Sequence, residues 1–312
     1  MENNMKKKAA SISILSNTTL IMLKIFAGLM SGSVSIISEA IHSSIDLVAA
    51  LMAYFSIKQA DKPADHLHPF GHGKYENLSA FAESLLIIIA ALFIIYEAVL
   101  RMFSGSGLTG TSFAIIVMAI STMVNFFVSR YLFKIAKLTD SMALEADGKH
   151  LSTDVYSSLG VFIGLAIVAI TGFKILDSVT AIFIACFILY EGVVLTKNSI
   201  ANLLDSALPE AEVDLIRNVL QSHKKEVKSY DQLRTRKSGS QRHIDVHLAV
   251  CRNETIDKVH GTMDSIEDDL SAALPNSSIM IHPEPCIHQS ENCQKECHWD
   301  NTDAMDNILK DN

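Results

Sequence analysis

The sequence predicts an α-helical membrane protein with six transmembrane helices, followed by a small cytoplasmic α/β domain. Of the 312 residues, 49% are hydrophobic, and the long apolar runs all lie before residue 200. Two of these runs contain the same pair of ionisable residues, His42-x-x-x-Asp46 and His150-x-x-x-Asp154. After residue 200, short amphipathic segments replace the apolar runs. The chain is therefore expected to have a membrane part and a soluble part.

Six apolar runs are near or above the ~20 residues that a helix needs to cross a bilayer. They cover residues 10–30, 33–58, 79–101, 112–133, 142–172 and 175–198. Positive charge gathers before the first run and after the second and fourth, at Lys6, Lys7, Lys8, Lys58, Lys62, Lys74, Lys134, Lys137 and Lys149. The positive-inside rule then places both termini in the cytoplasm. No cleavable leader is expected, and the short loops suggest a bacterial-type inner (plasma) membrane.

Residues 204–285 have the pattern of a soluble domain with the order α-β-β-α-β. A helix is expected from Pro209 to about His223, followed by strands near 229–236 and 242–250. A second helix from Thr255 to Leu274 precedes a closing strand at Ser278–His282. About 80 residues form a small core, which favours dimerisation. The expected domains are 1–203 in the membrane, 204–285 in the cytoplasm, and a tail at 286–312 that contains cysteine and histidine.

The two His-x-x-x-Asp pairs predict a metal site, because residues i and i+4 share one face of a helix. At ~1.5 Å per residue, both pairs lie ~12–20 Å from a helix end, near the middle of a core ~30 Å thick. Two imidazoles and two carboxylates form a four-ligand N₂O₂ set for Zn²⁺. The alternative is that each residue is a polar packing residue satisfied by Ser43, Ser44, Ser152 and Thr153, but two matched pairs at one depth favour the site. Lys24, Glu83 and Glu97, which also lie in these spans, are expected to snorkel or to pair between helices.

A second metal site is expected in the loop between the second and third spans, with ligands Asp65, His68 and His72, and His66 as an additional donor. The Pro69-Phe70-Gly71 turn lets His68 and His72 converge without a helix, and a carboxylate completes three ligands for Zn²⁺. The alternative is a solvated polar loop.

The tail contains three cysteines and two histidines within thirteen residues: Cys286, His288, Cys293, Cys297 and His298. This clustering predicts a thiolate-rich metal site, although the spacing is not that of paired Cys-x-x-Cys motifs. The alternative is a flexible tail with reduced thiols, as expected in the cytoplasm. The net charge of −8 and the lack of a basic stripe argue against nucleic-acid binding.

The chain resembles the cation diffusion facilitators, a family of zinc-type metal/proton exchangers, over nearly its whole length. The resemblance rests on the six spans, the two His-x-x-x-Asp pairs, the loop Asp65-His66-Leu67-His68-Pro69-Phe70-Gly71-His72-Gly73-Lys74 and the segment Leu204-Asp205-Ser206-Ala207-Leu208-Pro209. It implies a homodimer whose cytoplasmic domains resemble small copper chaperones, and a structural charge pair between Lys74 and Asp205. It also implies a cytoplasmic metal site at His247, His260, His282 and Glu284, with Asp231 where some relatives have a histidine.

The expected function is therefore secondary active efflux of divalent transition-metal cations, chiefly Zn²⁺, from the cytoplasm in exchange for protons. Some relatives have a second carboxylate where this chain has His42, and imidazole favours Zn²⁺ over Mn²⁺ or Mg²⁺. Export of Cd²⁺, Fe²⁺ or Co²⁺ remains an alternative, as does a membrane-anchored metal sensor without transport. An enzyme is not expected, because the His-Glu-x-x-His motif of zinc hydrolases does not occur. The expected partners are metal ions, protons, a second copy of the chain and the lipid bilayer, with Zn²⁺ also as a structural or regulatory ion.

Overall fold

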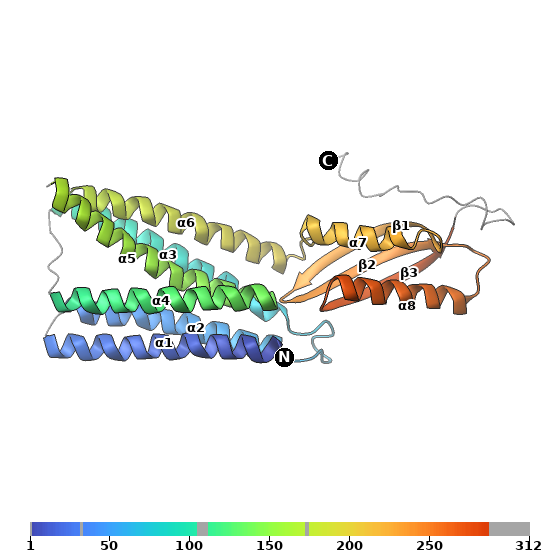
Figure 1. Cartoon of the computed structure of the whole chain (residues 1–312), viewed down its shortest axis with the longest axis horizontal. Coiled ribbons are helices and arrows are strands. Elements are labelled where there is room, and N and C mark those ends of the chain that lie inside the picture. The colour runs from blue at the N-terminus through green and yellow to red at the C-terminus, as the bar shows by residue number, and fades with distance from the viewer. Residues whose placement is uncertain (1, 32–33, 105–111, 172–174, 287–312) are drawn as a thin grey trace. The chain divides into compact units, whose positions relative to one another are not determined.

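The computed structural model describes residues 2–31, 34–104, 112–171 and 175–286 (Figure 1). The chain divides into two compact units, Met1–Leu203 and Leu204–Asn312, and each is described by itself.

The first unit consists of six long helices. They are α1 (Glu2–Ser31), α2 (Val34–Ala60), α3 (Lys74–Ser104), α4 (Ser112–Thr139), α5 (Met142–Thr171) and α6 (Ile175–Leu203). At ~1.5 Å per residue each is longer than the ~30 Å hydrocarbon core of a bilayer. The most extensive packing is of α3 against α6, of α1 against α2 and of α4 against α5, and α2 and α3 also both contact α5. The two helices with the His-x-x-x-Asp pairs are thus neighbours.

Three segments within the described residues are long and apolar enough to cross a membrane, namely Asn4–Ala27, Lys74–Leu100 and Ser178–Leu203. They lie in α1, α3 and α6. Six helices are present in this unit, but the count of six spans remains a prediction.

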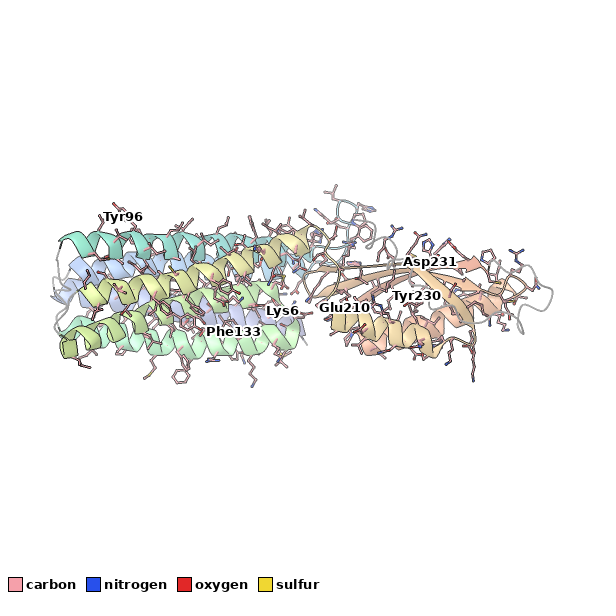
Figure 2. The ribbon with its side chains drawn as sticks, turned by 90° about the horizontal axis from the view of Figure 1, so that it is seen from above. Lys6, Tyr96, Phe133, Glu210, Tyr230 and Asp231 are labelled. Carbon is pink, nitrogen blue, oxygen red and sulfur yellow. The ribbon has the colours of Figure 1, made fainter. Side chains whose placement is uncertain are left out.

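The distribution of side chains in this unit is typical of a membrane protein. Large apolar residues are exposed along the helices, among them Phe26, Phe93, Phe127 and Phe183. Polar and charged residues such as Asn17, Lys24 and Glu83 are instead buried between the helices. Tyr96 is exposed near one end of the bundle (Figure 2), as tyrosines at a membrane interface often are. A surface of this kind is stable in lipid rather than in water.

A buried network ties the helices together at the bundle end that contains Lys6, opposite to Tyr96 (Figure 2). Lys6 Nζ of α1 lies 2.7 Å from Glu76 Oε1 of α3, and both side chains are almost fully buried. The hydroxyl of Ser141, between α4 and α5, donates to the other oxygen of Glu76. Glu76 therefore joins three parts of the bundle, and this fixes the start of α5, which contains His150.

The second unit confirms the predicted order of elements: α7 (Glu210–Ser222), β1 (Val227–Ser238), β2 (Gln241–Val250), α8 (Ile256–Ala273) and β3 (Ser277–Pro285). The sheet has the order β1-β2-β3. A tight turn at Gly239, whose φ of 60° suits glycine, joins the antiparallel strands β1 and β2. β3 pairs with β2 in parallel after the connection through α8. In the register of the sheet, His247 is opposite Asp231 on one side and His282 on the other.

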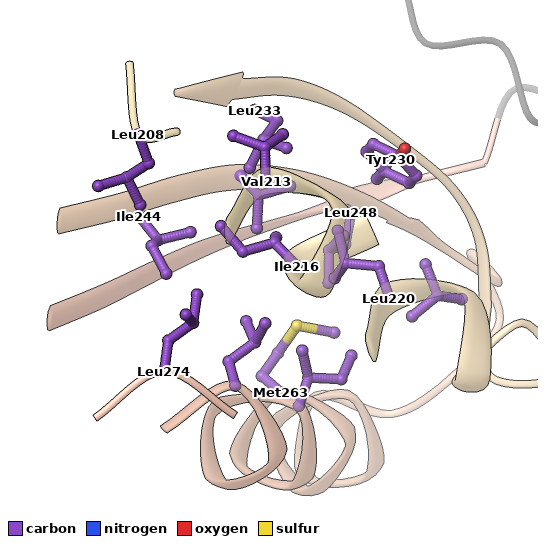
Figure 3. Packing of buried hydrophobic residues seen from close by; sticks show 14 of the residues in the cluster. Leu208, Val213, Ile216, Leu220, Tyr230, Leu233, Ile244, Leu248, Met263 and Leu274 are labelled. Carbon is purple, nitrogen blue, oxygen red and sulfur yellow. The ribbon is translucent and has the colours of Figure 1, made fainter. Parts of the chain in front are cut away.

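The core of this unit lies between the two helices and one face of the sheet (Figure 3). Apolar residues at helical spacing face inward, and they are Val213, Ile216 and Leu220 of α7 and Met263, Ile266 and Leu270 of α8. Alternate residues of β2 complete the core, namely Ile244, Val246, Leu248 and Val250. Each fully buried aliphatic side chain contributes about 1.5–3 kcal/mol. Because successive side chains of a strand point to opposite faces, His247 lies on the face away from the helices.

Candidate metal centres

The centre of the helical unit brings together two of the predicted transport ligands, Asp46 of α2 and His150 of α5. His150 Nε2 lies 3.2 Å from Asp46 Oδ1. The two residues are only 3% and 4% exposed, and α2 and α5 are in contact. Their pairing across two helices is therefore a specific feature of the packing, and it places an imidazole nitrogen and a carboxylate oxygen together, as a Zn²⁺ site requires.

Asp154 lies one turn beyond His150 on α5, and it accepts a hydrogen bond from Asn125 Nδ2 of α4 at 3.3 Å. Asn17 Nδ2 of α1 donates to the backbone carbonyl of Asp46 at 3.3 Å. The sequence reasoning did not identify these two asparagines, although a polar residue inside each apolar run was a signal. His42 lies in α2 one turn before Asp46, and its side chain is outside the described residues.

Lys24 and Glu83 differ in how they fit the expectation of snorkelling or interhelical pairing. Lys24 Nζ of α1 donates to Ser43 Oγ of α2 at 2.6 Å, and both residues are buried, so Lys24 does form an interhelical contact. Glu83 is fully buried, and its hydrogen bond comes from Ser79 of the same helix, at 2.9 Å. Glu83 therefore does not snorkel, and within the part of the chain that the structure describes no hydrogen bond joins it to another helix.

The loop between α2 and α3 brings together all three of its predicted ligands. Asp65 Oδ1 lies 3.3 Å from His68 Nδ1, and Asp65 Oδ2 lies 3.4 Å from His72 Nε2. The ligand atoms of these residues all lie within 4.8 Å of one another, which is close enough for one ion. A turn closed by the Gly71 N–H on the His68 carbonyl, with Gly71 at φ 81°, folds the loop back on itself. Convergence thus comes from local backbone geometry, as the sequence predicted.

Hydrogen bonds from the backbone favour the ionised form of Asp65 in this loop. The N–H groups of His68 and Leu67 donate to Asp65, and the His68 hydrogen bond is the main reason that the pKa of Asp65 lies below its usual value. Asp65 therefore stays ionised. His72 Nδ1 lies 3.2 Å from the Pro63 carbonyl, which accepts the proton of that nitrogen. The other ring nitrogen, Nε2, then faces Asp65.

The sheet of the second unit brings together His247, His282 and Glu284, with ligand atoms within 4.8 Å of one another. His247 Nδ1 lies 2.8 Å from Glu284 Oε1, and the two imidazole rings are 4.8 Å apart between centroids. Asp231 lies at the margin of the group, with Oδ1 3.8 Å from His247 Nδ1. Figure 2 labels Asp231 beside the core residue Tyr230 on β1.

His260 is not brought into this group within one chain. It lies on α8, which packs on the opposite face of the sheet, and its Nδ1 is 3.0 Å from Asp264 on the same helix. A hydrogen bond to the backbone and the charge of Asp264 raise the pKa of His260.

Of the predicted tail site, only Cys286 is among the described residues. It is buried against Cys251, and its N–H donates to the Val250 carbonyl at 2.8 Å. The other tail ligands, His288, Cys293, Cys297 and His298, lie outside the described residues.

The predicted pair of Lys74 and Asp205 would join the two units, and it stays a prediction. Within the first unit, Lys74 Nζ donates to the Leu203 carbonyl at 3.2 Å. Within the second, Arg236 Nη1 lies 3.3 Å from Asp205 Oδ1.

Comparison with known families gives two matches that together cover most of the chain. Residues 10–204 match the cation efflux transmembrane domain. Residues 208–286 match the cytoplasmic domain of cation efflux proteins. The boundary between them falls at the division between the two structural units.

Individual relatives match over nearly their whole length. An uncharacterised transporter of Synechocystis sp. is 32% identical over 91% of this chain and 92% of its own. The cation-efflux pump FieF of Yersinia pestis is 32% identical over 94% of this chain and 97% of its own. A solved structure described as a zinc transporter candidate, CzrB, in its Zn form is 30% identical over 28% of this chain and 99% of its own, with a TM-score of 0.26.

Proposed function

The chain belongs to the cation efflux family, and we propose that it exports Zn²⁺ from the cytoplasm in exchange for protons. Family membership makes it a divalent-metal efflux transporter of the membrane and not an enzyme, with a cytoplasmic domain of the dimerising type. The choice of Zn²⁺ and the exchange for protons are the proposed parts.

The pairing of His150 with Asp46 carries the proposal. Zn²⁺ accepts tetrahedral coordination by nitrogen and oxygen, whereas Mg²⁺ and Mn²⁺ prefer sites made of oxygen atoms. We assign Asp154 of the same helix face as a third ligand and His42 as the fourth. The hydrogen bond from Asn125 holds the Asp154 carboxylate in place, and such outer partners are known to tune metal affinity.

The same contact supports proton exchange. His150 Nε2 and Asp46 Oδ1, the two atoms proposed to ligate Zn²⁺, lie 3.2 Å apart in a hydrogen bond. A proton and a Zn²⁺ ion therefore compete for one pair of atoms. Metal binding requires neutral imidazole and ionised carboxylate, so it releases protons, and protons arriving from the more acidic side displace the metal. An inward proton gradient would thus drive Zn²⁺ outward as the helices rock between two access states.

We place the other metal centres outside the transport path. The loop group of Asp65, His68 and His72 and the sheet group of His247, His282 and Glu284 are proposed as binding or regulatory sites for Zn²⁺, with ions in the cytoplasmic domain favouring the transport-competent dimer. Asp231 and His260 are proposed to take part through the dimer, and the cysteines of the tail are proposed to capture cytoplasmic Zn²⁺.

The lysine distribution supports an inner-membrane protein with both termini in the cytoplasm.

The test is Zn²⁺ flux in proteoliposomes under an imposed pH gradient, with Asp154→Ala beside the native chain. We expect flux that follows the gradient in the native chain and is lost in the variant. Equal flux in both would move the pathway away from these residues. No flux in either, with Zn²⁺ still bound at the sheet group, would favour the alternative of a membrane-anchored sensor.

A further inference from the structure

Two carboxylates of the helical unit have no role in the function proposed so far, Glu83 of α3 and Asp147 of α5. Both residues are 0% exposed. Glu83 Oε2 and both carboxylate oxygens of Asp147 accept no hydrogen bond within the described part of the chain. Buried polar atoms nearly always have a partner, so three such oxygen atoms on two residues require an explanation.

The two carboxylates are close enough to repel each other electrostatically, and α3 and α5 are in contact. The other polar groups near them are Ser79, which donates to Glu83, and Ser13 of α1, which lies beside Asp147 without hydrogen-bond geometry. His150 and Asp46 also act on Asp147 through their charges. Two buried carboxylates with so few donors are stable only when a proton or a metal ion offsets their charge.

The position of Asp147 along α5 places it next to the proposed transport ligand His150. Asp147 precedes His150 by one turn of α5 and lies closer to the start of that helix, a rise of ~4.5 Å along its axis. Lysines near the starts of α3 and α5 make this end the cytoplasmic one by the positive-inside rule. An ion that travels from this end to His150 passes the level of Asp147 first.

We propose that Glu83 and Asp147 form a second site for the divalent cargo, which an ion occupies before it moves to Asp46 and His150. Two carboxylates supply a charge of −2, which matches a divalent cation, and the unpartnered oxygens are its ligands. A site made of oxygen alone holds Zn²⁺ less tightly than one with imidazole, so the ion moves on to the nitrogen ligands. This inference rests on the proposed transport role of the His150 site.

The experiment counts Zn²⁺ ions bound to the purified full chain by equilibrium dialysis at neutral pH. We expect Asp147→Asn and Glu83→Gln each to bind one ion per chain fewer than the native protein. The matched control is Glu145→Gln, which removes a carboxylate from the same helix, where Glu145 is half exposed and lies 3.6 Å from Lys149. It should bind the native number. Size exclusion and thermal unfolding confirm that each counted variant is folded.

A double variant separates the new site from the transport site. Asp154→Asn alone should lose one ion, and Asp147→Asn with Asp154→Asn should lose two. Loss of only one ion in the double variant would show that Asp147 merely supports the His150 site. An unchanged count in both Asp147→Asn and Glu83→Gln would show that the pair holds a proton only. Either result overturns the inference while leaving the flux test of the proposed function unaffected.

Discussion

The proposed metal-binding groups in the helical unit and in the sheet are both built from imidazoles and carboxylates, but they differ in their surroundings. Asp46 and His150 are nearly fully buried, whereas the side chains of His282 and Glu284 are 62% and 42% exposed. In water, a carboxylate without an ion is hydrated at little cost. Between helices, it must have a proton, a metal or a hydrogen-bond donor. Burial would therefore make the proposed helical site an exchange site, because one cation must replace another there.

The two environments also differ in what positions the ligands. In the sheet, the register places His247 beside His282, and in the loop the N–H groups of Leu67 and His68 orient Asp65. In the helical unit, ligands on α2 and α5 depend on the packing of whole helices and on amides from α1 and α4. A change in helix packing would alter the buried site, while the exposed groups would keep their local geometry. This is the behaviour that alternating access requires.

Removing a buried ligand should have the largest effect. We expect Asp46→Asn to lower the rate of Zn²⁺ flux at least about 100-fold, because the amide cannot supply the charge that offsets the metal and pairs with His150. Flux in proteoliposomes measures this. Glu145→Gln is the control and should transport at the native rate. Transport by Asp46→Asn within a few-fold of native would contradict the distinction between buried and exposed sites.

Removing the outer support of Asp154 should have a smaller effect. Asn125→Ala deletes the hydrogen bond at 3.3 Å, and we expect the Zn²⁺ concentration for half-maximal flux to rise about 10- to 100-fold. Ser129→Ala, one turn further along α4, deletes a hydroxyl whose hydrogen bond, among the described residues, stays within its own helix, to the Phe126 carbonyl. Equal changes in the two variants would mean that α4 acts through packing and not through Asp154.

A ligand of the exposed sheet group should affect binding much more than transport. We expect His247→Ala to lose the ion held with His282 and Glu284, counted by equilibrium dialysis of the full chain, and to lower flux only about 2- to 5-fold, a change of ~1 kcal/mol or less. Thr262→Ala, a change at a half-buried residue of α8, the helix that packs on the other face of the sheet, is the control. Flux abolished by His247→Ala would make the sheet group part of the pathway itself.

The sequence predicted the αββαβ order, and it predicted groupings of side chains wherever charge and spacing lie on one segment. The structure brings together the loop residues Asp65, His68 and His72, and it pairs Asp46 with His150. Their role as metal ligands stays a prediction. Asn17 and Asn125 were missed because a lone amide in an apolar run, with no charge and no partner at helical spacing, gives only a weak signal. His260 and His247 do not group within one chain, because α8 packs on the core face of the sheet and His247 lies on the other face. The sequence could not show this separation, because it depends on how α8 packs. The count of spans stays a prediction because, within the described residues, only α1, α3 and α6 contain a segment long and apolar enough to cross a membrane. In α5, the charged residues Glu145, Asp147, Lys149 and Asp154 all lie in the first half of the helix.

The smallest expected effect concerns the pH dependence of the exposed loop. The N–H groups of His68 and Leu67 lower the pKa of Asp65, so their stabilisation of the loop is complete above the ordinary aspartate pKa of ~3.9 and is lost only as the pH falls through the lower folded value. Between pH 7 and 5, Asp65 does not titrate, and protonation of imidazole alone must release Zn²⁺ from the loop. Asp65→Asn should therefore weaken Zn²⁺ binding there by the same factor at every pH between 5 and 7. The measurement compares the Zn²⁺ dissociation constant against pH with and without Asp65→Asn, in chains that also carry His247→Ala, Asp147→Asn and Asp154→Asn so that these other proposed sites do not contribute. A factor that changes across this range would show that the Asp65 carboxylate titrates there, and the loop would then resemble the buried site in how it exchanges cations.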